Sequence, residues 1–162
     1  MFLGENKRID ARPVDESAEL DPDKEMKYEV ADPEEFVRIR DSMKPDLLAY
    51  LTPHTAEEYR RLGATLYLAT DKKSGFGIKP DKQLISVFSL YKRRGRKIVE
   101  LTVQLGATSV ECLGEMLRRL YGQAGFQIVE SLSWDEALAP KHWDYDGHGR
   151  PNYYILKREM ID

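Results

Sequence analysis

Apolar and polar residues alternate in short stretches along most of the chain, and the period of the alternation changes from one stretch to the next. A period of two indicates a half-buried strand, whereas apolar residues three or four apart indicate an amphipathic helix. Residues 64–91 contain three strand-like runs separated by two turn sequences, which predicts an antiparallel meander. The pattern predicts strands over residues 27–31, 64–70, 76–79, 83–91, 108–113, 126–134 and 153–157.

Four helices are predicted from their start and stop signals. Asp32 followed by Pro33 and two glutamates combines an N-cap, a first-turn proline and an acidic first turn. Thr55 opens a second capping pattern, and Gly63 is suited to the left-handed cap at the far end of that helix. The predicted helices run from Pro33 to the stop at Lys44-Pro45, from Thr55 to Gly63, over residues 98–105 and over residues 115–123.

The order of these elements predicts an α+β fold. A strand, two helices, three strands, a helix, a strand, a helix and two strands make a mixed, mostly antiparallel sheet flanked by helices on both faces. The chain has 162 residues, the size of one domain. Residues 1–26 are rich in acids and carry no periodic apolar pattern, so we predict a flexible acidic lead-in before a single domain over residues 27–162.

Composition narrows the functional classes. A net charge of −3 disfavours a general nucleic-acid binder, and the longest apolar runs are far short of the ~20 residues of a bilayer-spanning helix. The start of the chain lacks the apolar core of a secretory signal. One cysteine, Cys112, excludes an internal disulfide and fits a cytoplasmic protein, and with three histidines it does not assemble a zinc site, so no metal is expected.

A basic loop at residues 92–97 is the first candidate for chemistry. A strand that leads into a basic loop and then a helix predicts an anion site, because the free N–H groups and the positive end of the helix point the same way. Gly95 allows close approach of the backbone to a ligand. A solvated loop and an RNA-binding patch are the alternatives. Charge suited to a diphosphate comes from Arg93, Arg94, Arg96 and Lys97.

Glu111 is the candidate for a general base. It lies in the middle of a predicted strand, where a carboxylate is costly unless it is paired or faces a cleft. A carboxylate at a sheet edge, or one paired with an arginine, is the structural alternative, and a water chain could replace a side-chain base. Cys112 follows on the opposite face of the strand, where an inert buried thiol is expected.

The element order over residues 27–158 resembles the GCN5-related N-acetyltransferase (GNAT) fold. The sharpest local match is residues 117–126, LRRLYGQAGF, similar to the family's fourth helix, in which a tyrosine precedes Gly-Phe. In that family the fourth strand, a basic glycine-containing loop and the next helix bind the pyrophosphate of acetyl-CoA. The family loop ends in Gly or Ala, whereas Lys97 stands there in this chain.

The resemblance implies an acetyl-CoA-dependent N-acetyltransferase acting on a small-molecule or protein amine. Tyr121 would protonate the departing CoA thiolate, and Glu111 or water would deprotonate the amine. Polarisation of the thioester carbonyl would fall to backbone N–H groups near Phe88, Ser89 and Leu90. Two alternatives stay open: Tyr121 simply packs in the core, or the chain is a non-catalytic member of the fold that binds a protein or a nucleotide.

The chain also resembles bacterial and phage-borne GNAT-like proteins. The features that carry this resemblance are Leu51-Thr52-Pro53, Ser74-Gly75-Phe76, and Ala139-Pro140 followed by Trp143. The last of them lies in a predicted loop over residues 135–151, which is long enough to be functional. We interpret this loop as a substrate-side surface with Trp143 and Tyr145 as contacts, and anchoring of Trp143 in the core as the alternative.

Overall fold

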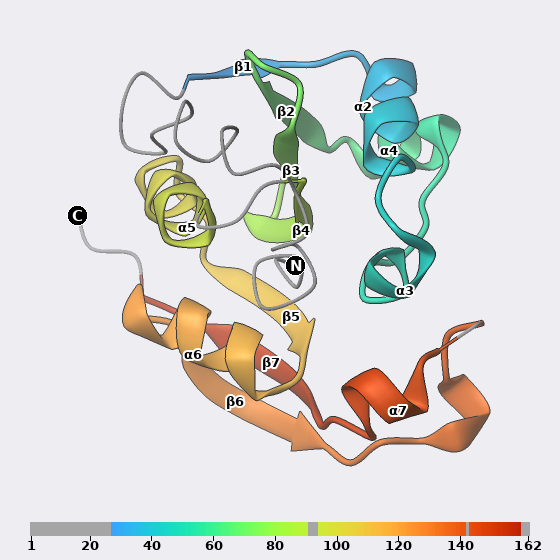
Figure 1. The fold of residues 1–162 in the computed structure, drawn as a ribbon. Coiled ribbons are helices and arrows are strands. Elements are labelled where there is room, and N and C mark those ends of the chain that lie inside the picture. Colours follow the sequence, from blue (N-terminus) through green and yellow to red (C-terminus); the bar gives the residue numbers. More distant parts are fainter. Residues whose placement is uncertain (1–26, 91–93, 142, 160–162) are drawn as a thin grey trace.

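A seven-stranded sheet runs through the centre of the molecule (Figure 1). The structure is a computed structural model that describes residues 27–90, 94–141 and 143–159, so the predicted acidic lead-in lies outside the described residues. The strands are β1 (Tyr28–Val30), β2 (Thr65–Ala69), β3 (Ser74–Ile78), β4 (Gln83–Ser89), β5 (Ser109–Leu113), β6 (Gln127–Leu132) and β7 (Tyr153–Lys157).

Strand order in the sheet is β1-β2-β3-β4-β5-β7-β6. Strands β2 to β4 form the predicted antiparallel meander. Strand β1 pairs antiparallel with β2, and β7 inserts antiparallel between β5 and β6. The central pair, β4 and β5, is parallel. The sheet is therefore mixed and mostly antiparallel, which confirms the predicted α+β class.

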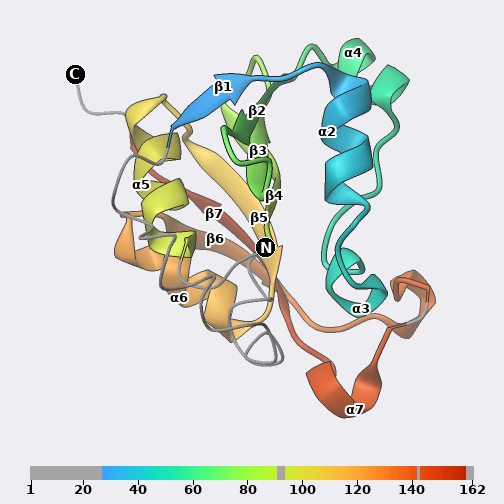
Figure 2. The ribbon, with the colours of Figure 1, turned by 45° about the horizontal axis from the view of Figure 1, so that its top comes forward.

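Helices cover both faces of the sheet (Figure 2). One face carries α2 (Pro33–Arg40) and α4 (Ala56–Leu62), and the other carries α5 (Gly95–Gln104) and α6 (Glu115–Gln123). Phe36 of α2 meets Phe88 of β4 edge-to-face at 5.5 Å between ring centroids. On the opposite face Arg118 of α6 lies 5.8 Å from the ring of Tyr154 in β7. No helix in the described part of the chain is long and apolar enough to cross a membrane.

The predicted starts of α2 and α4 are confirmed by their hydrogen bonds. The Asp32 carboxylate accepts from the N–H groups of Glu34 and Glu35 at 3.1 and 3.3 Å. Thr55 and Glu58 exchange the two bonds of a capping box, at 2.8 and 3.1 Å. Gly63 ends α4 in the left-handed conformation, with φ 71°.

Several element boundaries differ from the prediction. Helix α2 ends at Arg40, before the predicted stop at Lys44-Pro45. Pro45 instead begins the short helix α3 (Pro45–Leu48), because proline is tolerated at the first helical position. Helix α5 begins at Gly95, three residues before the predicted start, so part of the predicted basic loop is helical. The predicted loop over residues 135–151 contains the 3₁₀ helix η3 (Glu136–Leu138) and the one-turn helix α7 (Tyr145–His148).

Strand β6 forms the outer edge of the sheet. All of its residues are exposed, including the apolar Ile128, Val129 and Leu132. A register shift between Ile128 and Glu130 interrupts its pairing with β7. The interruption bends this edge and shortens its regular ladder, which is one way in which native sheets discourage pairing with other chains.

We predict that Gly75→Ala destabilises the protein, whereas Gly122→Ala does not. A Cβ at Gly75 would lie 2.6 Å from the Tyr67 carbonyl oxygen and 2.9 Å from side-chain atoms of Leu68 and Phe88. Overpacking of this kind costs about 1–3 kcal/mol. Gly122 in α6 has open space around it, and alanine there should stabilise the helix by up to about 1 kcal/mol. Chemical denaturation measures both; equal effects would contradict the predicted crowding at Gly75.

Candidate active site

The two central strands separate soon after they meet. The described parts of β4 and β5 pair only at Gln83–Ser109 and Leu84–Val110. Beyond Leu84, β4 continues beside β3 alone, and β5 continues beside β7 alone. We call the region between residues 85–89 and residues 111–113 the splay. Backbone that leaves a ladder in the middle of a sheet exposes polar groups to a ligand, so the splay is the natural place to look for a site.

A bulge in β4 marks the point of separation. Gly75 pairs with Phe88 but Gly77 pairs with Ile85, so β4 carries one residue more than β3 between these pairs. Ser86 lies inside this bulge with φ 55°, in the left-handed region that a serine rarely adopts. Its hydroxyl lies 2.6 Å from the hydroxyl of Tyr59 on α4. The bulge thus turns Ser86 toward the face covered by α2 and α4.

The register of β4 corrects part of the predicted backbone contact. The N–H group of Leu90 donates to the Lys73 carbonyl at 2.7 Å, which directs it toward β3. Because alternate N–H groups along a strand point to the same edge, the N–H of Phe88 also faces β3. Of the three predicted residues, only Ser89 turns its N–H toward the splay. The roles predicted for the Phe88 and Leu90 N–H groups are therefore wrong.

Arg94 is also placed differently from the prediction. Its side chain is 1% exposed and forms an ion pair with Asp71 in the turn between β2 and β3. It also donates to the Ser74 hydroxyl at 3.2 Å, and that hydroxyl is 2.8 Å from the hydroxyl of Tyr28. Burial raises the pKa of Tyr28 to about 12, so its phenol keeps its proton. The guanidinium of Arg94 fastens the start of α5 to the sheet and does not face solvent, where a phosphate would bind.

The start of α5 remains a candidate anion site without Arg94. Arg94, the N-cap residue, makes no side-chain capping bond, so among the described residues the N–H groups of Gly95, Arg96 and Lys97 lack the usual capping partner. Arg96 is exposed and Lys97 is half-buried. The helix dipole and these two cations all favour an anion at this position. Arg93 was predicted to join them and lies outside the described residues.

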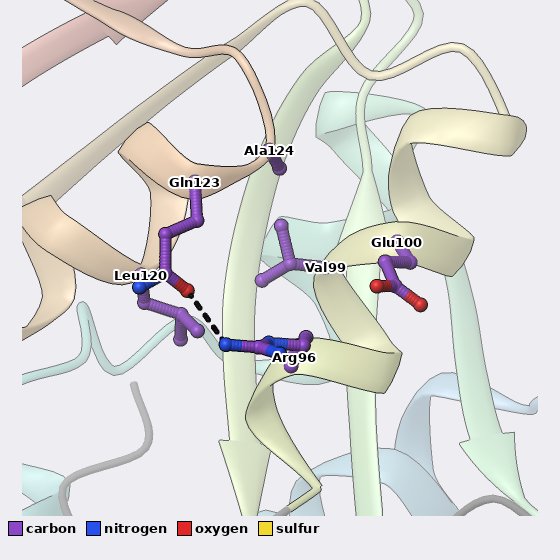
Figure 3. Close-up of a pocket in the computed structure, with 6 residues that line it drawn as sticks. All are labelled: Arg96, Val99, Glu100, Leu120, Gln123 and Ala124. Carbon is purple, nitrogen blue, oxygen red and sulfur yellow. Dashed lines mark hydrogen bonds between the residues drawn. The ribbon is translucent and has the colours of Figure 1, made fainter.

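A groove between α5 and α6 begins beside this helix start (Figure 3). It encloses about 310 Å³, and Arg96 spans it to reach the Gln123 side-chain oxygen at 3.3 Å. Glu100 places a carboxylate on the same groove. The floor and walls are completed by Val99, Leu120 and Ala124. Apolar walls with a few polar groups are typical of sites that bind small molecules.

Tyr121, the predicted acid, lies in α6 on the inner side of the helix. Its side chain is 2% exposed and packs edge-to-face on Phe126, with 5.9 Å between ring centroids. Leu120, its neighbour, lines the groove between α5 and α6. The structure thus places Tyr121 in the core next to the groove, a position that both predicted roles, acid and packing residue, would occupy.

Glu111, the predicted base, is exposed on β5 and accepts a hydrogen bond from the hydroxyl of Tyr153 on β7. Burial and the neighbouring carboxylate raise the pKa of Tyr153, so its phenol stays protonated as a donor. One carboxylate oxygen of Glu111 is used by this contact. Tyr153 was not predicted, because only the register of β5 against β7 brings it to Glu111, and no local sequence signal reports that register.

The two predicted catalytic residues lie on opposite sides of the sheet. Cys112 and Tyr154 are paired across β5 and β7, and Glu115 of α6 accepts from the Tyr154 hydroxyl at 2.9 Å. Their face therefore carries α6 and Tyr121. Glu111, one residue earlier in β5, points to the face that carries α2 and α4. Cys112 itself is buried as predicted, and burial raises the pKa of its thiol to about 12.

An aromatic cluster joins the predicted long loop to the segment after α3. Trp143 is buried and lies 4.9 Å from Tyr50 and 5.0 Å from Trp134, between ring centroids. Its indole N–H donates to the Gly149 carbonyl at 2.8 Å. Trp143 therefore anchors the loop in the core, which was the predicted alternative to contact with a substrate. Tyr145 is half-buried and donates to Glu136 at 3.0 Å.

This arrangement, a mixed and mostly antiparallel sheet between two layers of helices, is the fold of the GNAT acetyltransferases. The resemblance predicted from residues 27–158 is confirmed at the level of the fold by similar solved structures. A protein proposed to be a phosphinothricin N-acetyltransferase is 18% identical with a TM-score of 0.54, and the alignment covers 85% of this chain and 99% of that one.

Two further structures show the same fold. YncA from Salmonella typhimurium, proposed to be an acetyltransferase and solved with its cofactor acetyl-CoA, is 12% identical with a TM-score of 0.53. That alignment covers 86% of this chain and 96% of YncA. An N-acetyltransferase from Staphylococcus aureus is 10% identical with a TM-score of 0.50, covering 85% of this chain and all of that one, 100%. No protein-family model and no curated protein sequence matches the chain.

We predict that Arg94→Ala lowers the free energy of unfolding by about 2–3 kcal/mol, because it leaves Asp71 and Ser74 without their charged partner. The loss should fall below that of a fully buried pair, because Asp71 is partly exposed. Arg96→Ala is the matched control and should change stability by less than about 0.5 kcal/mol. Urea denaturation of both variants measures the difference. Equal stabilities would contradict a structural role for Arg94.

Proposed function

We propose that this protein is an acetyl-CoA-dependent N-acetyltransferase whose acceptor is an amine. The observation that carries the proposal is the splay of β4 and β5 next to the uncapped start of α5. An extended thioester arm fits between separated strands, and a diphosphate fits the N–H groups of a helix start. Acetyl-CoA, which the YncA structure contains, joins these two chemistries in one molecule.

The residues of this chain that would hold the cofactor are those at the start of α5 and along the groove. The N–H groups of Gly95, Arg96 and Lys97 and the two cationic side chains would bind the diphosphate. Of the three β4 residues predicted to contact the thioester, Ser89 is the one whose N–H group faces the splay. When bound, acetyl-CoA supplies an acetyl group activated as a thioester.

Transfer would proceed by direct attack of the amine. A bond forms between the amine nitrogen and the acetyl carbon, and the bond from that carbon to sulfur breaks. Glu111, or water beside it, would take the proton that the amine loses. Tyr121 would give its proton to the thiolate that leaves. The separate placement of Glu111 and Tyr121 is compatible with this division, because the amine nitrogen and the sulfur are different substituents of the reacting carbon and exchange their protons at different points.

A second candidate is a non-catalytic protein of the same fold that binds a protein or a nucleotide. Two observations favour it: Tyr121 is buried, and Arg94 is paired inside the molecule. Both residues would then be purely structural. Binding of CoA without any transfer to amines would support this candidate.

We predict that the protein binds CoA with micromolar affinity and that Arg96→Ala combined with Lys97→Ala weakens CoA at least about tenfold. Pantetheine lacks the diphosphate, so its affinity should not change. Arg38→Ala is the control, because Arg38 is an exposed arginine on α2, across the sheet from α5. Calorimetric titration gives each affinity. No heat at millimolar CoA would reject the proposed cofactor, and equal losses for pantetheine would reject the phosphate contact.

We predict that Tyr121→Phe lowers turnover about 10²–10⁴-fold with CoA affinity unchanged, as expected for a positioned acid. Thiol release from acetyl-CoA over a panel of amines and peptides supplies the assay. Because the ring of Tyr121 is buried, phenylalanine keeps its packing, and the variant should fold normally. Unchanged turnover would assign Tyr121 to the core alone.

For Glu111→Gln we likewise expect turnover to fall about 10²–10⁴-fold. Glu111 is exposed, so its replacement should leave thermal stability nearly unchanged. Glu130→Gln is the control, since Glu130 lies on the same face of the sheet, across Ile155 of β7. Equal turnover losses in both variants would indicate a general effect of negative charge on this face, and no loss in Glu111→Gln would leave proton removal to water.

A further inference from the structure

Three polar side chains form a chain of hydrogen bonds behind the bulge of β4. Arg40 at the end of α2 is 3% exposed, and its guanidinium donates to the Tyr59 hydroxyl at 3.0 Å. Tyr59 is completely buried, and its hydroxyl lies 2.6 Å from that of Ser86. The guanidinium is held from its other sides by the His54 carbonyl at 2.8 Å and the Asp41 carboxylate at 2.9 Å.

The donors and acceptors that each group has determine the direction of these hydrogen bonds. A guanidinium only donates, so the Tyr59 oxygen accepts from Arg40. The Tyr59 proton then goes to Ser86, because the reverse direction would leave a buried phenol proton without an acceptor. Ser86 accepts at its oxygen, and its own proton points away from Tyr59. Ser86 is thus a hydrogen-bond donor whose hydroxyl is oriented by its bond with Tyr59.

The same hydrogen bonds exclude Ser86 as a general base. A proton taken up at Ser86 would have to pass to Tyr59 and then to Arg40, but the guanidinium is already fully protonated. Ser86 therefore cannot accept a proton from the acceptor amine. Ser86 can instead donate a hydrogen bond to an oxygen atom. The Arg40 guanidinium, at the other end of this series of hydrogen bonds, strengthens that bond.

The place of Ser86 identifies that oxygen. Ser86 lies two residues beyond Leu84, the last residue of β4 that pairs with β5, and it is half-buried at the start of the splay. Its hydroxyl lies on the face of the sheet to which Glu111 also points. If the thioester occupies the splay, as the proposed function requires, its carbonyl oxygen is the acceptor group of the reacting centre, and it gains negative charge when the amine attacks.

We propose that the Ser86 hydroxyl donates a hydrogen bond to the acyl carbonyl oxygen of the bound thioester, and that Tyr59 and Arg40 are the positioning residues that aim it. This inference rests on the proposed function. Ser86 is the catalytic residue of the three, because it alone reaches the reacting atoms. Tyr59 and Arg40 act through it, and they also hold the left-handed backbone of Ser86 in place.

The test compares acetyl-CoA with S-ethyl-CoA, a thioether that lacks the carbonyl oxygen, by calorimetric titration. We expect the native protein to bind acetyl-CoA more tightly. Ser86→Ala and Tyr59→Phe should each reduce this preference about three- to tenfold, with S-ethyl-CoA affinity unchanged. The double variant should lose no more than Ser86→Ala alone, because both changes remove the same contact.

Two controls separate the hydroxyl from its surroundings. Ser86→Gly removes the hydroxyl but suits the left-handed backbone, so it should lose the preference while keeping or gaining stability. Tyr67 lies on β2, and its ring stacks on Phe76. Tyr67→Phe removes a tyrosine hydroxyl there and should change the affinity for neither acetyl-CoA nor S-ethyl-CoA. Should Tyr59→Phe fail to fold, the two serine variants still decide the question.

Each outcome has one meaning. A preference for acetyl-CoA that survives in Ser86→Ala and Ser86→Gly overturns the inference and leaves the proposed function standing. A loss in Ser86→Ala that Tyr59→Phe does not share overturns the positioning role. Failure of the native protein to bind either ligand overturns the proposed function, and the inference with it.

Discussion

The candidate active site depends on one constraint of the backbone: β4 does not pair with β5 beyond Leu84. Ser86 takes a left-handed conformation that costs a non-glycine residue of order 1–3 kcal/mol, and a conformation of that kind persists only when its surroundings over-determine it. Here Tyr59 and Arg40, both buried, supply those surroundings from α4 and α2. The shape of the splay is therefore linked to packing on one face of the sheet, while the proposed anion site lies on the other, at the start of α5.

Features that depend on neighbouring residues could be predicted from the sequence. The caps of α2 and α4 each involve residues two or three positions apart, so their signals are visible in a short window. The meander follows from turn residues between short alternating runs. The exposure of Glu111 and the burial of Cys112 follow from the two-residue period of a strand, without knowledge of what either side chain meets.

Features that depend on distant partners could not be predicted. Arg94 looks like any other cation of the basic loop in the sequence, and its inward position depends on Asp71, 23 residues earlier. Ser86 and Tyr59 are 27 residues apart, and Glu111 and Tyr153 are 42 apart. Likewise, the alternation of N–H groups along β4 was predictable, but the edge that faces β3 is set by the pairing of Leu90 with Lys73. Sequence patterns identify types of residue, and tertiary register decides their partners.

The sparse pairing of β4 with β5 also divides the sheet into two parts. Strands β1 to β4 form one continuous stretch of chain, β5 to β7 form another, and within the described strands two residue pairs join them. Each part can complete its own backbone ladder without the other, so the seam is where cooperativity within the sheet is weakest. A molecule bound across that seam would contact both parts at once. It would act as a missing strand, and the most ordered form of the sheet would then be the one that holds its ligand.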